Sequence, residues 1–147
     1  MQSRTFTTPE AAALAGFPAA HARVVASARA EDDAYVLLDT GPEGHPYLYG
    51  TCLRREHGGW REVASGNGPG WTLTDPDAGL GTAVVWGQAP EAADRVRAVL
   101  HGRVREADVA DGVYLVAWWR VAFPGPGHPR VEAFRVHGRW NPADPDL

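Results

Sequence analysis

The chain has 147 residues, of which 44% are hydrophobic and 22% are charged. This composition is typical of one ordinary globular domain or of two very small ones. Fourteen basic and eighteen acidic residues leave a net charge of -4, so we expect neither nucleic acid nor a membrane as a partner, because both attract basic surfaces. No apolar run approaches the roughly 20 residues that cross a bilayer. The N-terminus resembles no secretory signal, so we expect a cytoplasmic protein.

All fourteen basic residues are arginine, and lysine and isoleucine are absent from the sequence. This bias is typical of a GC-rich genome, and we expect an actinobacterial source. Because arginine stands wherever lysine would have served, the identity of a single arginine does not indicate a selected phosphate or carboxylate site.

Residues 1–66 are predicted to form a short helix followed by a four-stranded antiparallel sheet. Thr8 provides a hydroxyl at the N-cap, Pro9 occupies the first helical position, and Glu10 places a carboxylate in the first turn. Four segments rich in β-forming residues follow, separated by acidic or glycine-rich turns. They cover residues 24–28, 34–38, 47–53 and 60–64.

Residues 67–81 are rich in glycine, proline and aspartate, and we predict a connecting loop, which is either a linker or a functional loop. Two ligand motifs lie in or beside it. The segment Gly66–Gly70 resembles a phosphate cradle, but Pro69 removes an N–H donor and no helix start follows. The segment Asp75–Gly79 resembles the start of a calcium loop, but its twelfth position is Trp86 instead of glutamate. We therefore expect ordinary turns at both places.

Residues 82–147 are predicted to form a second unit, which resembles a β-sandwich. Turn signals recur at the spacing of roughly 8 to 12 residues that is typical of a sandwich or barrel. The segment 113–121 is long and apolar, so we expect a central strand that is covered on both faces. The predicted strands cover residues 82–87, 95–100, 104–109, 113–121 and 131–136, with a short closing segment at 139–140.

The run from Val84 to Trp140 contains a tight turn at Asp111-Gly112, a pair of adjacent tryptophans and the closing segment Phe134–Arg139. It resembles Ig-like small β-sandwich segments of uncharacterised actinobacterial proteins. The resemblance implies a sandwich fold for this part and carries over no activity and no functional residue. For the whole chain we predict a β-rich α+β fold. Its two halves are expected to form one cooperative body, because neither is large enough to be comfortably stable alone.

The segment Val36–Gly41, a hydrophobic strand that ends in Asp39-Thr40-Gly41, resembles the catalytic turn of aspartic proteases. In that chemistry two carboxylates share a proton, and one acts as the base on a water molecule. This chain has one copy, so a homodimer would have to supply the second carboxylate, and Pro42 replaces the small apolar residue of the family. The alternative is a structural turn in which Asp39 caps backbone N–H groups. We favour the turn, and Asp39 is the one acid that we nominate for catalysis.

The six histidines form no pair at metal-binding spacing. The single cysteine, Cys52, cannot close an intramolecular disulfide, and it lies inside a predicted strand, where a thiolate is not favoured. We therefore expect no metal site and no cofactor, and we interpret Cys52 as a buried thiol.

The six tryptophans are the clearest remaining clue to function. Side chains alternate along a strand, so Trp118 and Trp119 point to opposite faces and cannot enter one core. One of them is expected to face a second layer of the same chain, a protein partner or a ligand groove. In the last case, the pocket would be lined by Trp71, Trp86 and Tyr114.

We predict a non-catalytic binding or protein-interaction module, because no nucleophile, acid–base pair or metal cluster stands out in the sequence. Its partner would be a protein, a second copy of the chain or a small molecule. The alternative is a small-molecule-binding protein or enzyme in which residues 66–81 form a lid over an aromatic pocket, with Asp39 as its acid. The predicted binding residues are five aromatic side chains: Trp71, Trp86, Tyr114, Trp118 and Trp119.

Overall fold

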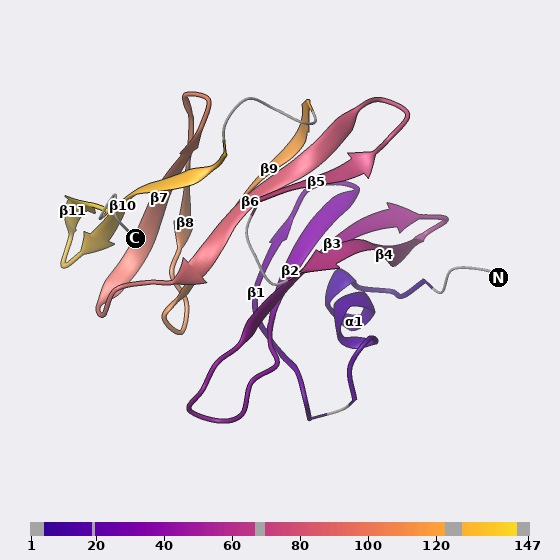
Figure 1. Cartoon of the computed structure of the whole chain (residues 1–147), viewed down its shortest axis with the longest axis horizontal. Coiled ribbons are helices and arrows are strands. Elements are labelled where there is room, and N and C mark those ends of the chain that lie inside the picture. Colours follow the sequence, from indigo (N-terminus) through magenta and orange to yellow (C-terminus); the bar gives the residue numbers. More distant parts are fainter. Residues whose placement is uncertain (1–4, 19, 67–69, 123–127, 144–147) are drawn as a thin grey trace.

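The computed structural model describes residues 5–18, 20–66, 70–122 and 128–143, and of Gly66 and Trp71 it describes the backbone alone. Within these ranges the chain forms one short helix and eleven strands (Figure 1), which confirms the predicted β-rich α+β class. No helix in the described ranges is long and apolar enough to span a membrane. The elements are α1 (Pro9–Leu14), β1 (Arg23–Arg29), β2 (Asp33–Asp39), β3 (Leu48–Glu56), β4 (Gly59–Gly66), β5 (Gly70–Asp75), β6 (Leu80–Gln88), β7 (Ala93–Leu100), β8 (Arg103–Asp108), β9 (Val113–Ala122), β10 (Arg130–Val136) and β11 (Arg139–Pro142).

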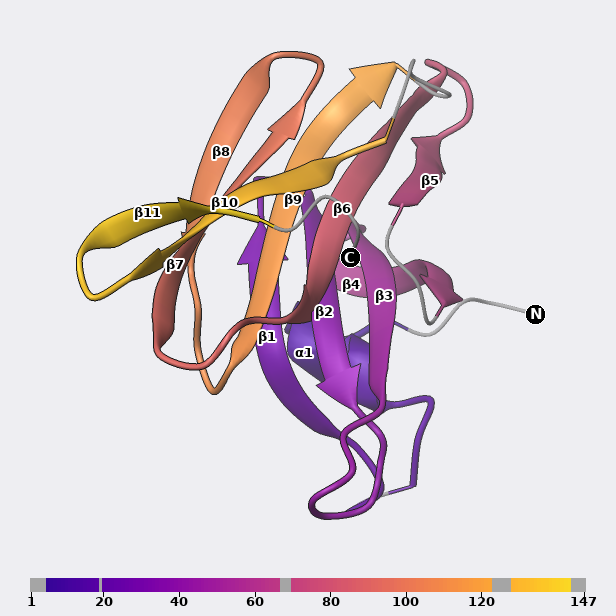
Figure 2. The ribbon, with the colours of Figure 1, turned by 60° about the vertical axis from the view of Figure 1, so that its left-hand side comes forward.

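The strands form three antiparallel sheets, which we name A, B and C. Sheet A has the order β1-β2-β3-β4, sheet B the order β5-β6-β9 and sheet C the order β11-β10-β7-β8. Helix α1 covers one face of sheet A, while sheet B lies between the other face of sheet A and sheet C (Figures 1 and 2). The described chain is therefore a stack of four layers.

The N-terminal helix forms where the sequence predicts it. Thr8 has an extended backbone, and its hydroxyl accepts a hydrogen bond from the Ala11 amide at 3.1 Å, as an N-cap residue does. A helix of six residues is too short to be stable alone. It depends on the packing of Ala12 and Ala13 against sheet A, where Trp60 is almost completely buried.

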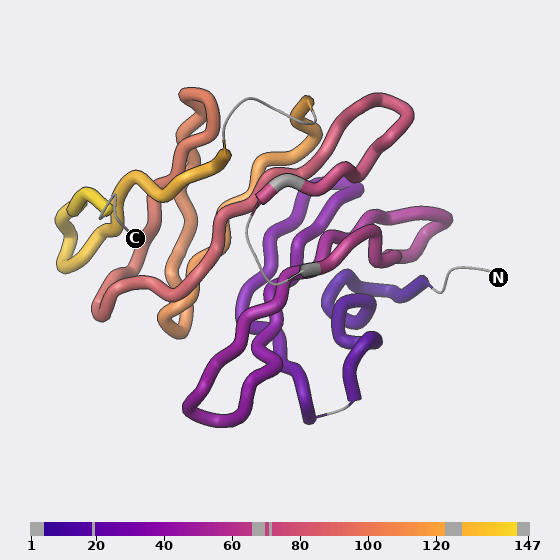
Figure 3. Tube along the Cα trace, viewed as in Figure 1, coloured from indigo at the N-terminus to yellow at the C-terminus, as the bar shows by residue number. Residues whose placement is uncertain are grey.

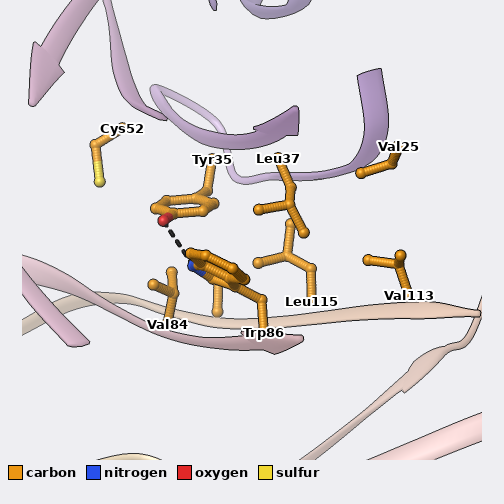
Figure 4. Packing of buried hydrophobic residues seen from close by; sticks show 9 residues of the cluster. Val25, Tyr35, Leu37, Cys52, Val84, Trp86, Val113 and Leu115 are labelled. Carbon is orange, nitrogen blue, oxygen red and sulfur yellow. Dashed lines mark hydrogen bonds between the residues drawn. The ribbon is translucent and has the colours of Figure 1, made fainter. Parts of the chain in front are cut away.

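Sheets A and B pack face to face through an apolar layer, which we name the A/B interface (Figure 4). Its aromatic pair is Tyr35 of β2 and Trp86 of β6, and the Trp86 indole donates a hydrogen bond to the Tyr35 hydroxyl at 2.8 Å. Both rings therefore fill the layer without leaving the indole donor unpaired. The buried members of the layer are Val25, Tyr35, Leu37 and Cys52 of sheet A and Val84, Trp86, Val113, Leu115 and Ala117 of sheet B.

The other face of sheet B packs on sheet C, and we name this second layer the B/C interface. Trp118 lies in it with 3% of its surface exposed, and its indole donates a hydrogen bond to the Arg103 carbonyl of β8 at 3.2 Å. The Ala117 carbonyl of β9 accepts a hydrogen bond from the Arg105 guanidinium of β8. Side-chain hydrogen bonds thus join strands β8 and β9, which are edge strands of different sheets.

Strand β9 contributes to both apolar layers. Trp118 is a member of the B/C interface, whereas its neighbour Trp119 is half-buried and packs against the A/B interface. The prediction that the two indoles point to opposite faces is confirmed. Strand β1, from the N-terminal part of the sequence, lies against β9 (Figure 3), and sheet A thereby covers the side of β9 that carries Trp119.

One prediction about the middle of the chain is wrong. Residues 67–81 are not a connecting loop throughout, because Gly70–Asp75 forms strand β5 and pairs with β6. Threonine and tryptophan favour extended structure, and β6 supplies a hydrogen-bonding partner. This β-propensity and pairing outweigh the turn preference of the glycines and prolines on either side. The layers also do not follow the predicted division at residue 81, because β6 and β9 share sheet B with β5 and contribute to the A/B interface.

Gly50 of β3 lies against the Tyr35 ring, and a Cβ added at Gly50 would overlap the Tyr35 hydroxyl. We expect Gly50→Ala to displace this ring, break its hydrogen bond to Trp86 and lower the free energy of unfolding by about 1–3 kcal/mol. Urea denaturation followed by tryptophan fluorescence measures the loss. Gly16→Ala is the matched control, since nothing lies within 4 Å of a Cβ at that position. Equal stability of the two variants would contradict this description of the A/B interface.

Candidate functional site

Four charged side chains meet at one end of the A/B interface, and we name them the charged cluster. Asp33 of β2 and Arg54 of β3 come from sheet A, where they lie opposite each other in the strand register. Asp75, the last residue of β5, and Arg120, near the end of β9, come from sheet B. These residues are far apart in the sequence. They are brought together because their strands begin or end at the same end of the two packed sheets.

Arg54 connects the two sheets. Its Nη1 donates a hydrogen bond to the Thr74 carbonyl of β5 at 2.7 Å, and its Nη2 lies 3.5 Å from Oδ2 of Asp75. Both contacts are on sheet B, although Arg54 itself belongs to sheet A. These contacts of the guanidinium are therefore not with Asp33, its neighbour across the strand pair, although its positive charge still acts on that carboxyl and lowers its pKa.

Arg120 lies in a β-bulge of strand β9. Gly81 of β6 pairs with Val121, while Ala83 pairs with Trp118, so two residues of β9 lie opposite the single residue Thr82 of β6. Arg120 has φ 51°, a left-handed conformation that costs a residue with a side chain roughly 1–2 kcal/mol. Bulges and such strained residues occur frequently beside functional sites, where they redirect a side chain.

Asp75 links the turn between β5 and β6 to the charged cluster. Its Oδ1 accepts a hydrogen bond from the Ala78 amide at 3.3 Å, and the Gly79 amide donates to the Pro76 carbonyl, which confirms the turn expected at Asp75–Gly79. Its Oδ2 lies 3.5 Å from Arg54 and 3.6 Å from Arg120. One carboxylate oxygen therefore shapes the turn, while the other balances the charge of two guanidiniums.

Asp33 is the most deeply buried member of the charged cluster, with 4% of its surface exposed. Its Oδ1 is buried and has no hydrogen-bond partner in the described part of the chain. Burial raises the pKa of Asp33, and the positive charges of Arg54 and Arg120 oppose this effect only in part. A buried carboxylate oxygen without a donor is rare and calls for an explanation, such as a bound ligand or a catalytic role.

The chemistry of the charged cluster is that of recognition. Carboxylates and guanidiniums form charge-assisted hydrogen bonds, which are roughly twice as strong as bonds between neutral groups. Arginine stays protonated in proteins and does not act as a base. The cluster therefore offers fixed charges of both signs to a ligand.

The aromatic residues that we expected to bind a ligand do not share one pocket. Trp86 lies in the A/B interface, whereas Tyr114 packs against the B/C interface, where its ring meets Phe134 edge-on at 5.4 Å between centroids. The prediction of one pocket lined by both residues is wrong, because their side chains lie on opposite faces of sheet B. The side chain of Trp71 and residues 67–69 lie outside the described part of the chain, and the described residues 70–81 contain strand β5 and the start of β6 where a loop was expected.

Asp39 has the surroundings of a turn cap. One of its oxygens accepts hydrogen bonds from the Gly41 amide at 2.9 Å and the Tyr47 amide at 3.0 Å, and the other accepts one from Arg23 at 3.2 Å. Burial acts to raise the pKa of Asp39, but these hydrogen bonds and the charge of Arg23 together lower it. A carboxylate held in the ionised form by three donors favours the structural interpretation over the shared proton of an aspartic protease.

Cys52 is buried, as the sequence predicts. Burial is the main cause that raises the pKa of its thiol to about 11, so the thiolate needed for nucleophilic attack is disfavoured. In the ranges that the structure describes, histidine, cysteine, aspartate and glutamate form no group of three or more that could hold a metal ion.

The sequence pattern does not predict the charged cluster. It predicts turns at Asp33 and at Asp75, and the absence of lysine from the chain leaves the arginines uninformative. The available signal was the prediction that residues 34–38 and 47–53 are neighbouring strands of one antiparallel sheet, since the pairing of β2 with β3 is what places Arg54 opposite Asp33. The pattern of apolar and polar residues does not predict the bulge that positions Arg120.

Comparisons with family models, with curated proteins and with solved structures found no match to this chain. The Ig-like resemblance of residues 84–140 consequently stays a prediction.

The strain at Arg120 is measurable by comparing two substitutions. Arg120→Gly and Arg120→Ala both remove the guanidinium, but glycine adopts a left-handed conformation without steric cost. We expect the glycine variant to be more stable than the alanine variant by about 1–2 kcal/mol in urea denaturation. The same pair of substitutions at Leu73, an exposed strand residue without positive φ, is expected to give the opposite order. If alanine is the more stable residue at both positions, Arg120 is not strained.

Proposed function

We propose that this chain is a non-catalytic binding module of a bacterial cytoplasm and that the charged cluster is its binding site. The observation that carries the proposal is Oδ1 of Asp33, a buried acceptor to which no described residue donates a hydrogen bond. A carboxylate left in this state costs free energy, and a donor supplied by a ligand would recover it. The free, buried thiol of Cys52 supports a reducing compartment.

Binding is a better interpretation than catalysis because of the groups that are present. The charged cluster contains two carboxylates and two guanidiniums, and neither type of group is a nucleophile activated by a neighbouring base. Asp39, the acid nominated from the sequence, accepts hydrogen bonds from two amides of its own turn and from Arg23 of β1. The enzyme alternative also loses its aromatic pocket, since Trp86 and Tyr114 face different layers.

The positions of Trp118 and Trp119 do not indicate an external partner. Trp118 and Trp119 are each packed against another layer of the same chain, so internal packing explains why both are present. An interface with a protein or with a second copy stays a prediction that these residues do not support. The charged cluster therefore replaces the aromatic residues as the proposed contact site.

The proposal predicts that Asp33 is retained for binding at the expense of stability. We expect Asp33→Asn, which removes the buried charge, to raise the free energy of unfolding at neutral pH by about 1–3 kcal/mol. Because the pKa of Asp33 is raised in the folded state, its ionisation costs stability as the pH rises above the ordinary value of 3.8. The gain should therefore disappear well below that pH. Urea denaturation at a series of pH values measures it.

Asp32→Asn is the matched control for this experiment. Asp32 is the preceding residue, is exposed and pairs with Arg55 at 3.3 Å, so its substitution is expected to change stability little or to lower it slightly. A loss of stability in Asp33→Asn at neutral pH would show that the Asp33 charge supports the fold, and the proposed function would then fail.

A further inference from the structure

The charged cluster contains an acceptor, Oδ1 of Asp33, to which no residue in the described ranges donates a hydrogen bond. Asp33 lies opposite Arg54 in the strand register, the position from which a guanidinium would normally reach it. Arg54 instead donates to the Thr74 carbonyl and lies near Asp75. Oδ1 of Asp33 thus stays buried without a hydrogen bond from any described residue.

The same cluster contains a donor that is scarcely used. Arg120 has five N–H donors in its guanidinium, and within the described residues its contact is an ion pair of 3.6 Å to an Asp75 oxygen that Arg54 also approaches. Its side chain is 53% exposed. The backbone of Arg120 has a φ of 51°, and its guanidinium lies 3.6 Å from Asp75 while about half of the side chain stays exposed to solvent.

The balance of charge restricts what would bind there. Two carboxylates and two guanidiniums sum to zero. A simple cation would satisfy Asp33 but would lie beside two positive side chains, and a simple anion would satisfy Arg120 but would lie beside two negative ones. A ligand that carries both charges matches both unused groups and leaves the total unchanged.

We infer that the charged cluster binds a zwitterion of the α-amino acid type, with its ammonium on Asp33 and its carboxylate on Arg120. This inference rests on the proposed function and adds the class of ligand. Both contacts would be charge-assisted hydrogen bonds, which favours a zwitterion over a neutral amide of similar shape. Since Asp33 is 4% exposed and the Arg120 side chain is 53% exposed, the ammonium enters the protein and the carboxylate stays near the surface.

Three small probes test the inference on the full chain. Glycine is the smallest zwitterion of this type, and methylammonium and acetate each carry one of its two charged groups. Titrations of the isotopically labelled protein are followed by the amide resonances of Asp33 and Arg120 in NMR spectra. We expect glycine to bind one to one and at least tenfold more tightly than either methylammonium or acetate.

Matched variants locate the binding. Asp33→Asn and Arg120→Gln are each expected to weaken glycine binding at least tenfold. The control variants Asp32→Asn and Arg55→Gln, which alter the exposed ion pair beside the cluster, are expected to leave it unchanged. The amide spectrum of each free variant reports whether it is folded.

The outcomes separate this inference from the proposed function. Methylammonium or acetate binding as tightly as glycine, with loss in Asp33→Asn or Arg120→Gln, would overturn the zwitterion and leave a binding site at the charged cluster. Glycine binding that both variants retain would overturn the location. No binding of any probe would overturn the inference, and the stability of Asp33→Asn would then decide separately whether the proposed function stands.

Discussion

Strand β9 imposes the constraint on which the rest of the structure depends. Successive side chains of a strand point to opposite faces, so the adjacent indoles of Trp118 and Trp119 cannot share a core. Sheet A covers one of them and sheet C the other, and sheet B becomes the central layer of the molecule. The hydrogen bonds that β9 receives from Arg105 and makes through Trp118 hold sheet C in place at its edge.

The same strand also positions the charged cluster. Trp118 and Val121 are both members of the B/C interface, although a regular strand would point residues three apart to opposite faces. The bulge between them resolves this conflict by placing two residues opposite Thr82, and Arg120 adopts its left-handed conformation there. A packing requirement in one layer thus directs a guanidinium toward Asp75 at the end of the other. Near it lies Asp33, whose Oδ1 accepts no hydrogen bond from any described residue. A strained residue beside such an acceptor is the combination that the proposed binding site would require.

The sequence was sufficient to predict most of the fold and little of the site. The helix at Thr8 and the alternation of β9 follow from capping chemistry and from the period of two along a strand, which are local properties. Strand β5 was missed because its pairing partner, β6, outweighs the turn-forming residues around it, and that partner is not a local property. The charged cluster was missed for the same reason. The packing of sheet A on sheet B brings Asp33 and Asp75 into one cluster, and a bulge directs Arg120 toward it. Neither is a local property of the sequence.

The measurement that tests this account most directly is the set of short proton–proton distances from the two indoles of β9 in NOE spectra of the folded chain. The layered arrangement predicts contacts from the Trp118 indole to side chains of β7 and β8, and contacts from the Trp119 indole to side chains of sheet A. If both indoles showed contacts to the same sheet, or if the Trp119 indole showed none to sheet A, sheet B would not be the central layer. This explanation of the bulge and of the charged cluster would then be wrong.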